Sequence, residues 1–135
     1  MKLLCLINRK PGMSVEDFRT YYETNHVPLV TRLLPFFTAY ERNYRDRAYS
    51  FVPAHLATRF IGPEFDVVTE VSFAGPPDYQ RMLDALANPE IGDVIRADEE
   101  NFLDRRTMAL YMVETLNTPG VVTPSQGEAG TTQDQ

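Results

Sequence analysis

The sequence predicts an α+β domain with the βαββαβ order of ferredoxin-like folds, in which a four-stranded antiparallel sheet carries its helices on one face. Three observations support this prediction. The chain begins with a short apolar stretch, its later strand-like stretches alternate or are apolar throughout, and amphipathic helical patterns separate them. With 135 residues, 43% of them hydrophobic, the chain is long enough for one domain with its own core.

The first strand and the first helix are the most clearly marked elements. Residues 2–8 (KLLCLIN) are apolar on both faces and end at the turn signal RKPG, which indicates a buried strand. Ser14 opens the capping pattern SVED, just before an amphipathic run. The apolar stripe of this run has spacings of three and four and consists of Val15, Phe18, Tyr22, His26 and Leu29.

Pro28 interrupts this helix. It has no N–H to donate to the carbonyl of Thr24, and its ring crowds that carbonyl. We therefore expect a kink or a restart near residues 25–27. In either case His26 leaves the helix on the same side as Phe18 and Tyr22.

Three more strands and one or two helices complete the predicted domain. Residues 36–49 are aromatic and roughly alternating, and residues 105–115 are moderately apolar on both faces. Residues 65–73 alternate cleanly, with Val67, Thr69, Val71 and Phe73 on one face. Each of the three stretches is predicted as a strand. Helices are expected to begin at the GPP of residues 75–77 and at Asn88–Pro89, an N-cap followed by proline. The positions expected to face inward are Tyr79, Met82, Leu83, Leu86, Ile91, Ile95, Asp98 and Phe102.

The domain is predicted to span residues 1–116. Residues 117–135 form a tail rich in Gly, Pro, Ser, Thr and Gln, which we expect to be disordered or packed on a partner subunit. Strands that are apolar on both faces need cover on the face that the helices leave open. We therefore expect a homodimer in which two sheets pack face to face.

Charge and composition exclude several function classes. The net charge is −6 with no cluster of Lys or Arg, so nucleic acid is not expected as a partner. No apolar run approaches the ~20 residues that span a bilayer, and no signal peptide is recognisable, which predicts a cytoplasmic protein without membrane contact. Cys5 is the only cysteine and lies in an apolar run, as a buried, inert thiol would.

Three stretches in order resemble the EthD family of the dimeric α/β-barrel superfamily. These are RKPGMSVEDFRTYYETNHVPLV, with its His-x-Pro-Leu, then FDVVTEVSF, then ADEENFLDRR. The resemblance covers residues 1–115. One departure is the pair Tyr21–Tyr22, where relatives often carry Trp.

The resemblance implies a ferredoxin-like homodimer that forms a dimeric α/β barrel. Relatives include fungal decarboxylases and dehydratases that tailor aromatic polyketides, and the wider superfamily includes polyketide cyclases, isomerases and cofactor-free oxygenases. What they share is proton transfer on a mostly apolar substrate, often without a cofactor.

His26, Tyr22 and Asp98 are the candidate catalytic residues. An imidazole titrates near neutral pH, which suits a general acid or base, although a core histidine that donates to a carbonyl freed by Pro28 is the alternative. The Tyr22 hydroxyl, one turn earlier, would stabilise a developing oxyanion or simply pack in the core. Asp98 interrupts an apolar stripe, so its carboxylate needs a partner: it orients His26, serves as a second acid or base, or caps the turn of residues 99–102.

The expected substrate contacts are His55, Glu70, Phe18 and Phe102. His55 lies in a loop and would pair with His26 only if that loop folds over the pocket; otherwise it is solvated. Asp66 and Glu70 share one face of their strand and would either reach the pocket or dimer seam, or pair with arginines such as Arg105 and Arg106. The sequence offers no metal-ligand spacing and no phosphate-binding glycine pattern, so neither metal nor nucleotide cofactor is expected.

Three functions follow from these residues. The first is a cofactor-independent enzyme that acts on a hydrophobic aromatic or polyketide-like substrate by decarboxylation, dehydration or cyclisation, with His26 as the proton carrier. The second is a cofactor-free oxygenase on an anthrone or phenol, which oxygen consumption would reveal. The third is a non-catalytic ligand-binding accessory protein. The residues alone do not name the substrate or the bond that changes.

Overall fold

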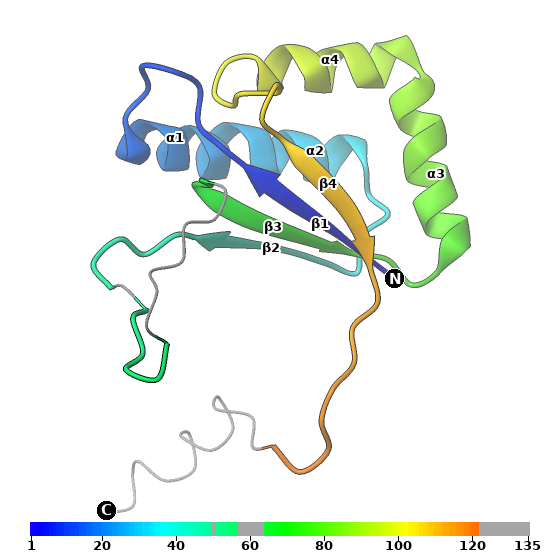
Figure 1. The fold of residues 1–135 in the computed structure, drawn as a ribbon. Coiled ribbons are helices and arrows are strands. Elements are labelled where there is room, and N and C mark those ends of the chain that lie inside the picture. Colours follow the sequence, from blue (N-terminus) through cyan, green and yellow to red (C-terminus); the bar gives the residue numbers. More distant parts are fainter. Residues whose placement is uncertain (50, 57–63, 122–135) are drawn as a thin grey trace, which may run out of the picture.

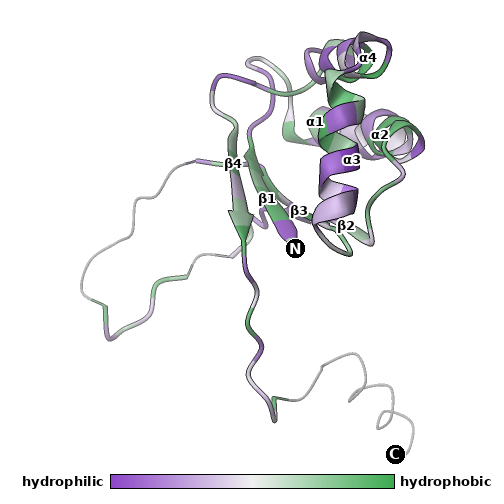
Figure 2. Ribbon diagram, turned by 90° about the vertical axis from the view of Figure 1, so that its right-hand side faces the viewer, coloured by the Kyte–Doolittle hydropathy of each residue, from purple (hydrophilic) through white to green (hydrophobic). Residues whose placement is uncertain are grey.

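The computed structural model describes residues 1–49, 51–56 and 64–121. The elements run β1 (Lys2–Ile7), α1 (Val15–Tyr21), η1 (Tyr22–His26), α2 (Val27–Leu33), β2 (Ala39–Tyr44), β3 (Val67–Ser72), α3 (Pro76–Ala87), α4 (Pro89–Glu99) and β4 (Ala109–Val113). Four strands form one antiparallel sheet in the order β2-β3-β1-β4. The predicted α+β ferredoxin-like fold is confirmed, and the helices lie together on one face of the sheet (Figures 1 and 2).

The first helical segment begins and breaks where the sequence predicts. The Ser14 hydroxyl accepts a hydrogen bond from the Asp17 N–H at 3.0 Å and so caps α1. Between α1 and α2 the chain makes a π-helical turn, η1, in which the Val27 N–H donates to the carbonyl of Tyr22. Pro28 cannot make the bond that an α-helix needs at its position, so the backbone widens here without changing direction sharply.

Several predicted strand limits were too long. The strand expected over 36–49 is only Ala39–Tyr44, because β2 pairs with β3 and β3 itself ends at Val67 opposite Tyr44. The strand expected over 105–115 is only Ala109–Val113. Its predicted start instead forms a turn, in which Asp104 accepts hydrogen bonds from the N–H groups of Arg106 and Thr107.

The core lies between the helices and the sheet. On β3 the alternation is confirmed: Val67, Thr69 and Val71 are buried toward the helices, whereas Val68 and Glu70 face the other way and are half-buried. Of the inward positions predicted on α3, Met82 is buried but Leu83 is 39% exposed, because one apolar stripe is too narrow to bury both neighbours.

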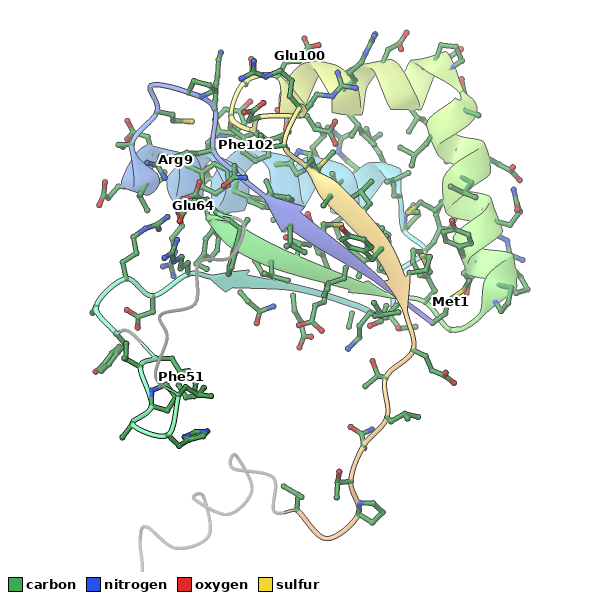
Figure 3. The ribbon with its side chains drawn as sticks, viewed as in Figure 1. Met1, Arg9, Phe51, Glu64, Glu100 and Phe102 are labelled. Atoms are coloured by element: carbon green, nitrogen blue, oxygen red, sulfur yellow. The ribbon has the colours of Figure 1, made fainter. Side chains whose placement is uncertain are left out.

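Among the described residues, none forms a helix on the opposite face of the sheet (Figure 2). The segment that follows β2 leaves the sheet on the side away from the helices, where Phe51 lies (Figure 3). Most of the predicted tail, residues 122–135, lies outside the described residues, so the predicted domain boundary at 116/117 stays a prediction.

Candidate active site

His26 stands at the end of the π-helical turn and points into the layer between helices and sheet. Its side chain is buried, with 6% of the residue exposed. The ring packs on Phe102, with ring centres 4.9 Å apart, and on Tyr22, with ring centres 5.5 Å apart. Widened turns of this kind are frequent at functional sites because they reorient one side chain without ending the helix.

Asp98 is the hydrogen-bond partner of His26. Its Oδ2 lies 2.8 Å from His26 Nδ1, and its Oδ1 accepts a hydrogen bond from the Tyr21 hydroxyl at 2.6 Å. Asn101 in turn donates to the Tyr21 oxygen at 2.9 Å. An ionised carboxylate only accepts, so this contact requires the proton on Nδ1 and leaves a lone pair on Nε2. The Asp98 side chain therefore binds the His26 ring, whereas its backbone carbonyl accepts from the Asn101 N–H in the following turn.

The surroundings of His26 favour the neutral imidazole. Burial lowers the pKa of His26 below its usual range, and the nearby Asp98 carboxylate only partly opposes this effect. A neutral imidazole with a free Nε2 lone pair is the form that accepts a proton. This form is what a general base at neutral pH requires.

A cavity of about 180 Å³ lies beside His26, between the helices and the sheet. Most of its lining is aliphatic or aromatic. Its polar lining side chains are those of Tyr22, His26, Tyr40, Thr69 and Glu99, with the thiol of Cys5. A mostly apolar cavity with a few converging polar groups is the usual form of a small-molecule site.

Two tyrosine side chains line this cavity. The Tyr22 hydroxyl is 2.7 Å from the Thr69 hydroxyl, on the central strand β3, and it also interacts with the Tyr40 hydroxyl. Burial raises the pKa of both Tyr22 and Tyr40. Both therefore remain protonated at neutral pH and can donate hydrogen bonds to a carbonyl or enolate oxygen.

The structure brings some of the predicted site residues together and leaves others apart. His26, Tyr22 and Asp98 converge. Phe18 and Phe102 were predicted to contact the substrate, but they are fully buried and do not line the cavity; Phe102 packs on the His26 ring and Phe18 packs on Phe102. His55 is exposed in the segment beyond β2 and does not reach the cavity.

Glu70 also lies outside the cavity, on the open face of the sheet. It pairs with Lys2 at 3.0 Å and accepts from Asn43 at 3.0 Å. Asp66 is buried and held by Arg9 and Arg47 at 2.6 and 2.7 Å. The expectation that these carboxylates pair with arginines is right for Asp66, but the partners named for it, Arg105 and Arg106, were wrong. Arg105 pairs with Glu100, and Arg106 pairs with Asp104, in the segment between α4 and β4.

Four residues of the site were not among the candidates predicted from the sequence: Tyr21, Tyr40, Thr69 and Glu99. Thr69 was predicted to share a strand face with Val67 and Val71, and this face is the one that turns inward. The alternation of residues 65–73 is therefore the signal that could have pointed to Thr69. Tyr21 belongs to the aromatic pair that departs from the family pattern. Glu99 follows Asp98 directly and falls off the apolar stripe of its helix.

Among the residues that the structure describes, no group of three or more His, Cys, Asp and Glu side chains is arranged to hold a metal ion. Over the same residues, no helix has the length and apolar character needed to cross a membrane.

Known proteins resemble this chain in sequence and in fold. A conidial pigment biosynthesis dehydratase named EthD, from Metarhizium robertsii, is 29% identical over 131 residues, which is 91% of each chain. An EthD family protein from Bacillus halodurans superposes with a TM-score of 0.54 at 17% identity, covering 86% of this chain and 99% of its own. A protein from Arabidopsis thaliana gives 0.52 at 14% identity, covering 87% and 98%.

The sequence also matches a family model directly. The EthD domain model covers residues 10–106, from the turn after β1 to the turn before β4. The match therefore includes His26, Asp98 and the two helical segments that carry them. On this match over most of its length, the chain belongs to the EthD family.

Proposed function

We propose that this protein is a cofactor-independent lyase of the dehydratase type, which removes water from a small hydrophobic hydroxy ketone related to aromatic polyketides. The observation that carries the proposal is the buried His26–Asp98 pair beside an apolar cavity. The name of the Metarhizium relative, a pigment biosynthesis dehydratase, supports the reaction type and the substrate class.

The cavity favours a small, ring-shaped substrate. Its volume of about 180 Å³ is below the ~300–1,000 Å³ of sites for drug-sized ligands. A compound with one or two fused rings matches this size, whereas an unfolded polyketide chain does not. The aliphatic side chains around it would exclude water and hold the flat ring system in one orientation.

The reaction follows from the roles of the polar groups. Nε2 of His26 accepts a proton from the carbon α to the ketone, and the electron pair moves to the carbonyl oxygen. The hydroxyls of Tyr22 and Tyr40 donate to this oxygen as it becomes negative. The enolate then re-forms the carbonyl and expels the hydroxyl on the β carbon, which leaves as water after it gains a proton. A C–H and a C–O bond break, and one C=C bond forms.

A direct test uses α-tetralone that carries a hydroxyl group on the carbon β to its carbonyl. Loss of water and tautomerisation give α-naphthol, which is followed by fluorescence. We expect turnover of this probe by the wild-type protein without oxygen uptake. Oxygen uptake during turnover would favour a cofactor-free oxygenase, and binding without any product would favour an accessory protein. Either result would reject the proposal.

We also propose that the protein acts as a homodimer in which the open faces of two sheets pack together. Leu4, Leu6, Val68 and Tyr111 form an apolar strip across this face, as the register of β1 with β3 and β4 shows. Tyr111 is 57% exposed, although it lies in the middle of its strand. Apolar residues in such a row are typical of an interface between copies.

The Tyr111→Arg substitution is expected to convert the dimer into a monomer. A guanidinium placed on the packed face of each sheet would bury an unpaired charge in the interface. Sedimentation equilibrium should show the mass falling from twice the 15.4 kDa of the chain to that value. The matched control is Val94→Arg on α4, where the side chain is 45% exposed on the helical layer and the dimer should persist. A monomeric wild-type protein would contradict the proposal.

A further inference from the structure

We propose that Glu99 is the second proton-transfer group of this site, and that its carboxyl group supplies the proton with which the substrate's hydroxyl leaves as water. This inference rests on the proposed function. Glu99 would be the general acid of the reaction, and His26 its general base.

The last turn of α4 presents two consecutive carboxyl groups to different parts of the site. Asp98 reaches Nδ1 of His26 and the hydroxyl of Tyr21, outside the cavity lining. Glu99 lines the cavity itself, together with His26. One helix end thus holds the residue that orients the base and, at the next position, a carboxyl group that can touch the substrate.

Glu99 lies on the side of the cavity next to the edge strand β4. Leu110 of this strand lines the cavity and is also 54% exposed, which marks this side as the mouth. The Glu99 side chain is itself 23% exposed. A substrate that enters here would pass Glu99, and a departing water molecule would leave past it.

The charged groups around Glu99 leave it free to act. Arg105 approaches from the turn before β4, but its Nε lies 3.9 Å from Glu99 Oε1, and its Nη1 is closer to Glu100, at 3.5 Å. Burial raises the pKa of Glu99, Asp98 and Glu100 push it in the same direction, and Arg105 opposes them. The other titratable groups of the cavity are His26, Cys5 and the two tyrosines.

The two environments divide the work between base and acid. The same burial that keeps the His26 imidazole neutral keeps a larger share of Glu99 protonated, and opposite pKa shifts of this kind assign a base and an acid in one site. In the reaction His26 gains the proton from carbon and Glu99 loses one to the departing hydroxyl. Transfer of a proton from the imidazolium to the carboxylate, through water, restores both groups.

The other protonated groups of the cavity are weaker acids. Burial raises the pKa of Cys5 to about 11 and raises those of Tyr22 and Tyr40 above their usual range. These groups can donate hydrogen bonds, but they give up a proton less readily than a carboxyl group. The choice of Glu99 therefore follows from its place in the lining and from the chemistry of its neighbours.

The test separates removal of the carbon-bound proton from loss of the hydroxyl. Deuterium exchange at the α carbon of plain α-tetralone, measured by proton NMR in heavy water, needs only the base. Dehydration of the β-hydroxylated probe needs base and acid. In Glu99→Gln we expect dehydration to fall by roughly 10²–10⁴-fold, whereas exchange stays within about twofold of wild type. The matched control is Glu90→Gln, which alters an exposed carboxylate in the first turn of the same helix, α4, and should change neither rate.

Each result decides between the proposals. Dehydration by Glu99→Gln at the wild-type rate would overturn the role of Glu99. Loss of exchange along with dehydration, in a variant with an unchanged melting temperature, would also overturn it, since Glu99 would then act through His26. A wild-type protein that neither exchanges nor dehydrates would overturn the proposed function and the role of Glu99 with it.

Discussion

Replacement of His26 by asparagine is expected to lower kcat for dehydration of the β-hydroxylated α-tetralone by about 10²–10⁴-fold, the usual contribution of a general acid or base. The amide nitrogen of asparagine can occupy the position of Nδ1 and donate to Asp98, which lies 2.8 Å from that nitrogen in the wild-type protein. No atom of asparagine replaces Nε2. The variant therefore keeps the orienting hydrogen bond and loses the base. Steady-state kinetics, with a melting curve to verify folding, measure the effect.

The pH dependence and the second histidine provide the controls. Because burial lowers the pKa of His26, the wild-type rate should hold as pH falls past the usual histidine range and decline only below it, as the imidazole gains its proton. This acidic limb should be absent from the residual rate of His26→Asn. His55→Asn, in the exposed segment beyond β2, should retain wild-type kinetics. An equal loss in both variants would contradict the role of His26.

The location of the base was predictable because local signals fixed it. Ser14 set the start of α1, the spacing of Phe18, Tyr22 and His26 set the buried stripe, and Pro28 set the break. Each signal depends on residues only a few positions apart. The strand alternation of 65–73 worked in the same way, which is why Thr69 and Val71 were placed on the correct face.

The partners of the base were harder to predict because the π-helical turn changes the helical period. In an α-helix, with 3.6 residues per turn, Tyr21 and His26 are five positions apart and point away from each other. In the widened turn, backbone bonds join positions five apart, and both side chains reach the same carboxyl group, that of Asp98. Pro28 predicted a break, but no residue pattern indicated that the break would be a widened turn.

Long-range neighbours were beyond reach for a different reason. Glu70 was grouped with the site through the family resemblance and His55 through its position in a loop. The sheet separates Glu70 from His26, and the chain carries His55 away from the helices. Conversely, Tyr40 and Glu99 come from β2 and α4, and only the packing of α4 over the sheet brings them into one cavity. Such contacts depend on the angle between elements, which periodicity alone does not determine.

Phe102→Ala is expected to lower the free energy of unfolding by roughly 3–5 kcal/mol, the usual cost of removing a fully buried phenylalanine. The ring is completely buried, and its centre lies 4.9 Å from that of His26 and 5.2 Å from those of Tyr21 and Tyr22. It follows the end of α4, where its carbonyl accepts from the Lys10 N–H at 2.8 Å. The backbone bond to Lys10 persists in the variant, whereas the ring contacts with His26 and the two tyrosines are lost. Urea denaturation measures the loss.

Two further variants distinguish packing from a general sensitivity of the helices. Leu83→Ala on α3, where the side chain is 39% exposed, should cost less than about 1 kcal/mol, because more than a third of the leucine already contacts solvent and its removal leaves no closed cavity. Phe102→Leu should fall between the two, since it keeps an apolar group but leaves part of the space behind His26 empty. If Phe102→Ala cost no more than Leu83→Ala, the Phe102 ring would not be a principal support of the His26 imidazole. Phe102→Leu should also lower activity while the protein remains folded, because the His26 ring loses the aromatic ring that packs against it and is oriented less firmly toward the cavity.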